Sequence, residues 1–200
     1  MKNEIERRYI PRSAGEVRFE RREGGKTGIA GTAAVVDSLS EELFGFREKI
    51  APGAFDSALK KSDIRGLFNH DPNMILGRTK PGTMTVRADG KGLHYDIPDL
   101  PASRADVAEA IERGDVDGNS FSFVVGKDSW EYPKEGPSIR TILEFDELFD
   151  LGPVTFPAYP QTTVSARARA MATAKPAESL VDASAASDAR RRALDLMAIE

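Results

Sequence analysis

Three segments of the chain carry side chains suited to nucleophilic chemistry, and the first contains a histidine. His70 stands in the segment Asn69-His70-Asp71-Pro72, where Pro72 keeps the preceding residue extended and the polar neighbours can bond to the backbone. An imidazole held at the end of a strand can act as a general base near neutral pH. The same pattern is also typical of a solvated surface turn.

A serine nucleophile is indicated in residues 114–123, GDVDGNSFSF, where a turn precedes a strand. Gly118 would permit a backbone conformation in which N–H groups around Asn119 and Ser120 converge on an oxyanion. Alternation along the strand puts Ser120 and Ser122 on one face and the two phenylalanines on the other. Ser120 is the first candidate and Ser122 its competitor. An ordinary hairpin strand with solvent-facing serines would have the same pattern.

The third segment is acidic and covers residues 144–150, EFDELFD. A carboxylate that orients the histidine and stabilises its protonated form would complete a triad. Strict alternation puts Asp150 on the face of Leu148 and Glu147 on the face of two aromatic residues, and a bulge would reverse this. Asp150 is the first candidate and Glu147 the alternative, while most of the other acids fit a charged solvent face.

Composition argues against several other kinds of site. The chain has no cysteine, so thiolate nucleophiles, disulfides and cysteine-ligated metals are excluded. Its two histidines would need mainly carboxylates to complete a zinc site, and in the set His70, Asp71, His94 and Asp96 only the last two share a strand face. We therefore expect no metal and no cofactor. A net charge of -4 predicts no nucleic-acid partner, and no apolar run is long enough to predict a membrane span.

The elements that must position these residues are mostly strands. Runs rich in β-branched and aromatic residues predict strands at 28–36, 84–88, 92–97, 120–125, 139–145 and 148–156. A helix is predicted over 102–113, with Ser103 as its N-cap and Gly114 at its end, and a shorter helix over 52–60. This pattern predicts a β-rich α+β fold, an antiparallel sheet closed or partly closed into a β-barrel with peripheral helices.

Three regions can be separated along the chain. Residues 1–14 are predicted to be an N-terminal extension and residues 15–164 a single domain of ordinary size. From residue 165 onward the sequence is rich in alanine and lacks aromatic residues, which predicts a flexible tail with a short helix over 188–199.

Four motifs, taken in order, resemble the tailed-phage prohead (capsid maturation) serine protease family, which is similar in fold to herpesvirus assemblin. They are E-x-I-x-P-G-A-F at 48–55, FNHDPNMILGRT at 68–79, ERGDVDGNSFSF at 112–123 and VTFPAYP at 154–160. The resemblance covers most of the domain and implies a serine endopeptidase. In it, the nucleophile falls on Ser120 and the base on His70.

The resemblance defines the remaining site residues less well. Relatives usually carry an acid where Asp150 stands, and another often matches Glu147. The assemblin branch uses a second histidine in that role, but His94 lies out of the expected order. Assemblins also support the oxyanion with arginine, for which Arg78 and Arg140 are candidates without a motif match.

The resemblance further implies a setting and partners. The substrates would be the scaffold or the scaffolding segment of the major capsid protein, together with the chain itself, inside the immature phage procapsid in the host cytoplasm. The gene would belong to a phage or prophage, the tail at 165–200 would be a target of self-cleavage, and oligomerisation stays open. The alternative hypothesis is a non-catalytic capsid assembly or scaffolding protein on the same fold.

Overall fold

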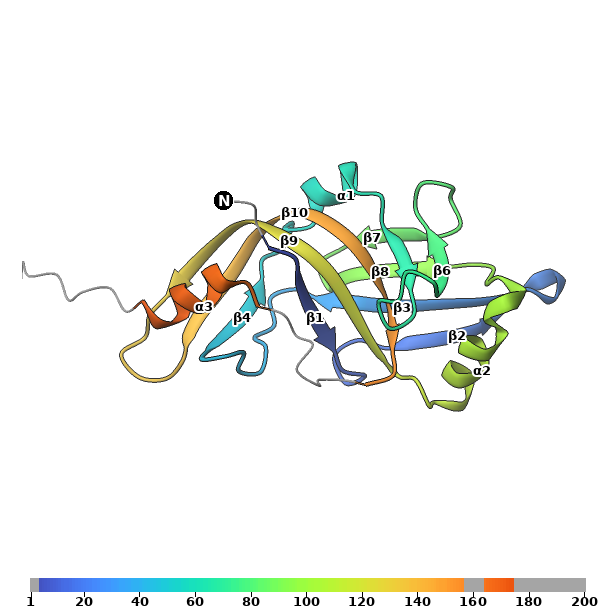
Figure 1. Ribbon diagram of the computed structural model, residues 1–200, viewed down its shortest axis with the longest axis horizontal. Coiled ribbons are helices and arrows are strands. Elements are labelled where there is room, and N and C mark those ends of the chain that lie inside the picture. The colour runs from blue at the N-terminus through green and yellow to red at the C-terminus, as the bar shows by residue number, and fades with distance from the viewer. Residues whose placement is uncertain (1–3, 157–163, 175–200) are drawn as a thin grey trace, which may run out of the picture.

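The computed structural model describes residues 4–156 and 164–174, which form two β-sheets with helices around them (Figure 1). One sheet contains β1 (Glu6–Ile10), β4 (Phe46–Ile50), β5 (Arg65–Leu67), β6 (Ile75–Arg78), β9 (Gly118–Glu131) and β10 (Ser138–Val154). The other contains β2 (Val17–Arg21), β3 (Thr27–Val35), β7 (Thr85–Ala88) and β8 (Gly92–Ile97). The helices are α1 (Asp56–Lys61), α2 (Ala105–Arg113), α3 (Ala166–Thr173) and the short 3₁₀ turns η1 (Glu23–Gly25) and η2 (Ala102–Arg104).

The two long strands β9 and β10 are the centre of the six-stranded sheet and lie side by side as an arch in Figure 1. The strand order is β1-β9-β10-β5-β6, and β4 pairs with another part of β10. Both β4 and β5 run parallel to β10, with α1 between them in the chain. The expectation of a purely antiparallel sheet is therefore wrong for these two pairings.

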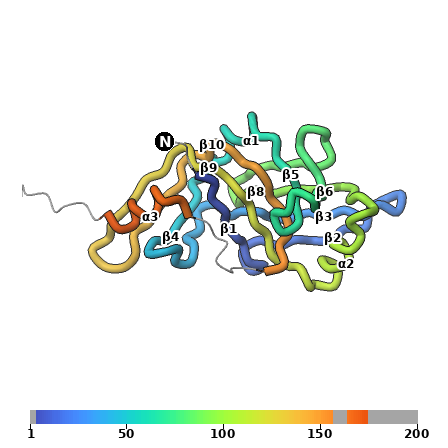
Figure 2. Tube along the Cα trace, in the orientation of Figure 1, coloured from blue at the N-terminus to red at the C-terminus, as the bar shows by residue number. Residues whose placement is uncertain are grey.

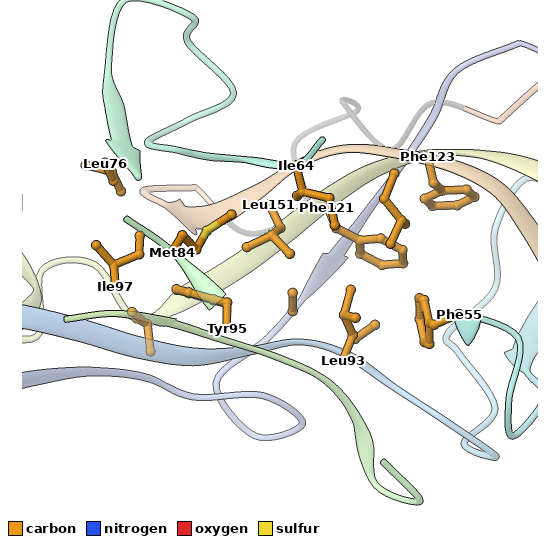
Figure 3. Close-up of a cluster of buried hydrophobic side chains, with 14 of the residues drawn as sticks. Phe55, Ile64, Leu76, Met84, Leu93, Tyr95, Ile97, Phe121, Phe123 and Leu151 are labelled. Carbon is orange, nitrogen blue, oxygen red and sulfur yellow. The ribbon is translucent and has the colours of Figure 1, made fainter. Parts of the chain in front are cut away.

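The predicted β-rich α+β class is confirmed, but the strands do not close into a barrel within the described residues. They form two open sheets, and no described strand of one sheet pairs with a strand of the other. The core lies between the sheets, where Phe121, Phe123 and Leu151 meet Leu93 and Tyr95 (Figure 3). Side-chain packing, in place of a continuous hydrogen-bonded cylinder, thus joins the two sheets.

Four phenylalanines form the part of this core beneath the arch. The Phe55 and Phe145 rings stack with centroids 4.5 Å apart, and Phe123 meets Phe145 edge-on at 4.9 Å. Phe121 packs against all three rings. Each buried ring contributes roughly 1.5–3 kcal/mol of transfer free energy. These phenylalanines fix which face of β9 turns inward, so the alternating serines face the other way.

Most predicted elements are present, with shifted bounds. The segments predicted as strands at 139–145 and 148–156 belong to the single strand β10, which continues through several register shifts. The helix predicted over 102–113 starts as η2 and ends at Gly114, whose φ of 80° is left-handed. Ser103 makes no cap: α2 has no side-chain cap hydrogen bond. The shorter helix begins only at Asp56, because a turn with Gly53 at φ 79° precedes it.

The ends of the chain are partly described. β1 lies within the span 1–14 assigned to an extension, and it pairs with β9 as part of the six-stranded sheet. α3 falls inside the span assigned to the tail and lies at the opposite end of the molecule from α2 (Figure 2). The helix predicted over 188–199 lies outside the described residues. No helix in the described ranges is long and apolar enough to cross a membrane.

Candidate active site

His70 lies in the turn between β5 and β6, and its side chain is only 7% exposed. Asn69 and His70 both have positive φ, 54° and 57°, a conformation that residues with side chains rarely adopt. Asn69 anchors the turn: its backbone N–H donates to the Pro153 carbonyl at 3.0 Å, and its Oδ1 accepts from the Thr155 N–H at 2.8 Å. The strained turn is therefore fastened to the end of β10, the strand that carries Asp150.

Three side chains from separate parts of the chain meet at this turn. His70 Nε2 lies 2.6 Å from Ser120 Oγ, and His70 Nδ1 is hydrogen-bonded to Asp150 Oδ1. Ser120 comes from β9, and the Asp150 side chain, from β10, is 10% exposed. The three groups form an unbroken serine–histidine–aspartate chain of contacts.

Ser122 completes the surroundings of the carboxylate. Its hydroxyl donates to Asp150 Oδ2, the oxygen that does not contact His70. Burial raises the pKa of Asp150, but the hydrogen bond and charge of His70, the Ser122 hydrogen bond and the charge of Arg7 outweigh it and lower the pKa below its ordinary value. An ionised Asp150 can only accept, so His70 Nδ1 donates to it, and in the neutral imidazole Nε2 is then left to accept from Ser120.

A β-bulge turns Asp150 toward the serines. Leu148 is paired with Phe123 in the core, whereas Asp150, two residues later, is paired with Ser122 on the other face. The register shifts between these two pairs, so Phe149 is an extra residue and the alternation is reset. Strict alternation, which puts Asp150 with Leu148, is therefore wrong at this position.

Comparison with known protein families places the chain in one of them. The sequence profile of the Caudovirus prohead serine protease family matches residues 15–176. The chain belongs to this family. It is accordingly a serine peptidase of the capsid-maturation class, and the matched span contains Ser120, His70 and Asp150. Comparison with curated proteins and with solved structures found no significant match.

Gly118, two residues before Ser120, has a role other than the expected one. Gly118 is in the ladder of β9 and is not among the described residues with positive φ, so the expected oxyanion nest is not formed there. A Cβ on Gly118 would lie 2.2 Å from the Tyr9 hydroxyl oxygen. Gly118 thus makes room for the Tyr9 ring, which crosses it from β1.

Other candidates lie apart from the three contacting side chains. Glu147 is exposed and paired with Val124, two pairs along the β9–β10 ladder from Asp150 and Ser122. His94 is on β8 of the other sheet, where its Nδ1 lies 3.0 Å from Thr32 Oγ1 and its Nε2 3.0 Å from Asp89 Oδ1. The metal set that includes His94 is therefore not assembled, and the described residues contain no group of three or more histidines and acids placed to hold a metal.

The two candidate oxyanion arginines are engaged elsewhere. Arg78 forms an ion pair with Asp63 at the edge of the sheet. Arg140 is buried and contacts Glu6 at 2.9 Å and Asp128 at 3.0 Å. Neither makes a hydrogen bond to Ser120 or His70 among the contacts of the described residues.

β1 is the part of the site that sequence reasoning missed. The Ser120 hydroxyl donates to the Arg8 carbonyl at 2.9 Å, and Arg7 and Tyr9 are paired with Ser122 and Ser120. A hydroxyl has one proton, so His70 Nε2 and the Arg8 carbonyl are alternative acceptors for it. The segment ERRYI has no apolar face, which is why no strand pattern marked it.

Proposed function

We propose that Ser120 is the nucleophile, His70 the general base and Asp150 the orienting acid of this peptidase. The observation that carries the proposal is the contact chain from Ser120 Oγ through both imidazole nitrogens to Asp150. Asp150 is preferred to Glu147 because only Asp150 contacts His70. Ser122 is unsuited as nucleophile because its hydroxyl is bonded to the carboxylate.

The reaction follows from these positions. Ser120 Oγ attacks the carbonyl carbon of a peptide bond while its proton passes to His70 Nε2. The imidazolium that forms is stabilised by Asp150, and its Nε2 proton then goes to the leaving amine as the C–N bond breaks. Water, deprotonated by the same imidazole, releases the acyl group from Ser120. During attack the Ser120 proton must be directed to His70 and away from the Arg8 carbonyl.

The natural substrates that we propose are the phage scaffold or the scaffolding segment of the major capsid protein, inside the immature procapsid. Support comes from membership in the prohead protease family. A cut confined to an assembled shell would make maturation irreversible once assembly is complete.

We also propose that the chain cleaves itself within residues 165–200. α3 belongs to this span and packs against the six-stranded sheet. Its Ala168 and Ala172 contact Phe46, and the Ser138 hydroxyl donates to the Ala172 carbonyl at 3.0 Å. Backbone held in a packed, hydrogen-bonded helix is cut less readily than exposed backbone. We therefore expect the cut to lie outside α3, in the rest of residues 165–200.

Co-expression with the neighbouring capsid and scaffold proteins tests the proposal, with every polypeptide read by intact mass. Ser120→Ala should abolish the truncations, and the matched variant Ser129→Ala, exposed on the same strand, should retain them. A fluorophosphonate should add its mass to the wild type and not to Ser120→Ala. Normal shells with identical, uncut polypeptides in wild type and Ser120→Ala would instead support the non-catalytic assembly protein.

A further inference from the structure

A row of arginines crosses the face of the sheet that carries the proposed triad. In the strand register Arg7 is paired with Ser122, and Ser122 is paired with Asp150. On the side away from Ser122, Asp150 is paired with Arg65 of β5. Arg78 of β6 follows Arg65. Directly paired residues on neighbouring strands have side chains on the same face, so the cations flank the carboxylate on both sides.

Arg7 differs from the other two arginines in its partners. Arg65 and Arg78 both pair with Asp63, at 3.5 Å for Arg65. The Arg7 side chain is half-buried and makes no hydrogen bond or ion pair with the described residues. The charge of Arg7 acts on Asp150 without a direct contact, and the two Asp150 oxygens are already bonded to His70 and Ser122. The guanidinium N–H groups therefore have no acceptor among the described residues, and a ligand carboxylate would supply one.

Arg7 is also within reach of a bound substrate. Ser120 is paired with Tyr9, so Arg7 is the diagonal neighbour of Ser120 across the β1–β9 ladder. Such diagonal neighbours are roughly 7–8 Å apart, and an extended peptide advances about 3.3 Å per residue. A peptide whose carbonyl carbon meets Ser120 Oγ therefore brings a side chain about two residues away to Arg7.

We propose that Arg7 is a specificity-determining residue that binds the carboxylate of a substrate Asp or Glu within about two residues of the scissile bond. The inference rests on the proposed function of Ser120. The guanidinium is a planar fork that can donate two parallel hydrogen bonds to a carboxylate. β1 precedes the matched span 15–176, so family membership does not assign this role.

The test is a cleavage profile of the full-length chain on peptides from a digested bacterial proteome, read by mass spectrometry. Ser120→Ala supplies the blank, and Arg18→Gln, an exposed arginine on β2 of the other sheet, is the matched control. The wild type and Arg18→Gln should favour Asp and Glu at one position near the cut. Arg7→Gln should reduce that preference about tenfold, as expected for one charge-assisted hydrogen-bonded pair, and Arg7→Glu should replace it with a preference for Lys and Arg.

Several outcomes would overturn the inference. If Arg7→Gln slows all peptides equally, Arg7 acts on Asp150 and not on the substrate. Cleavage without an acidic preference in the wild type overturns this inference and leaves the proposed function intact, whereas absence of Ser120-dependent cleavage overturns both. Binding to inactive Ser120→Ala gives a second readout: a Glu-containing peptide found in the profile should bind more tightly than its Gln counterpart, and Arg7→Gln in that background should remove the difference.

Discussion

At the scale of single residues, Asp150 of the proposed triad combines burial with hydrogen bonds to two different side chains. Its two oxygens serve different partners, His70 on one side and Ser122 on the other. It is nearly buried, and yet its pKa is lowered because these hydrogen bonds outweigh the loss of hydration. The lowered pKa favours an ionised carboxylate at the place where the proposed mechanism forms an imidazolium.

Asp150→Asn should lower kcat by about 10³- to 10⁴-fold, because an amide no longer stabilises the imidazolium or enforces the reactive tautomer. Glu147→Gln should leave kcat within about twofold, since Glu147 is exposed and contacts no triad member among the described residues. Steady-state kinetics on one peptide substrate measures both. Equal losses in the two variants would contradict the choice of Asp150.

Ser122→Ala should raise the pKa of Asp150 and lower kcat by roughly tenfold, because one of the hydrogen bonds that hold the carboxylate is lost.

The lowered pKa of Asp150 also determines how the free energy of unfolding changes with pH. Ionised Asp150 stabilises the fold above the ordinary carboxyl pKa of about 4, and this contribution is lost as the pH falls through the lower folded pKa. Urea unfolding at several pH values should show that Ser122→Ala loses stability at higher pH than the wild type. Superimposable pH profiles would contradict a role for Ser122 on Asp150.

At the scale of elements, a turn and a bulge bring the proposed triad together. The turn at Asn69 is bonded to Thr155, and the bulge at Phe149 turns Asp150 to the outer face. Between them, β5 lies close against β10, and Gly152 makes that approach possible: a Cβ there would lie 2.2 Å from the Leu67 carbonyl oxygen. The backbone contact requires glycine irrespective of any chemistry.

Gly152→Ala should therefore separate β5 from β10 and move the His70 turn away from Asp150. We expect a loss of about 2–4 kcal/mol in the free energy of unfolding and of most activity. Gly90→Ala is the matched control, because a Cβ at Gly90 has no atom within 4 Å. Chemical denaturation and peptide kinetics measure both effects, and wild-type behaviour of Gly152→Ala would refute this account of the contact.

At the scale of the whole molecule, an ionic cluster that is buried except for Arg167 links five elements. Arg8 contacts Glu6 and Glu48 at 2.7 Å, and Arg140 joins both acids and Asp128. Arg167 of α3 reaches the same Asp128 at 3.0 Å. These groups come from β1, β4, β9, β10 and α3, so the cluster fixes both described ends of the chain onto the sheet that carries the proposed triad.

Arg140→Ala should destabilise the fold by about 3–5 kcal/mol, because Arg140 is 1% exposed and its removal leaves buried carboxylates unpaired. Arg18→Ala, at an exposed position, should change stability by less than about 0.5 kcal/mol. Thermal and urea unfolding measure the difference. A loss no larger than that of the control would show that the cluster contributes little to the fold.

Several features could be predicted from the sequence because they depend on neighbours along the chain. The alternation Ser120-Phe121-Ser122-Phe123 by itself separates a core face from an outer face, and the structure follows it. The order of the four motifs indicated the family by resemblance, which the profile match confirms. For the two faces of β9 the physical cause is local, because side chains alternate along a strand.

Tertiary structure decided the rest. Asp150 meets His70 only because one extra residue in β10 resets its pairing with β9, and a bulge is a property of two strands, not of one. The side chains of Glu6 and Arg8 are buried because each meets an opposite charge from a distant part of the chain. Arg8 contacts Glu48, 40 positions away, and Glu6 contacts Arg140, 134 positions away. No pattern within ERRYI encodes such partners, since burial of a charge is decided by the residues that the fold brings to it.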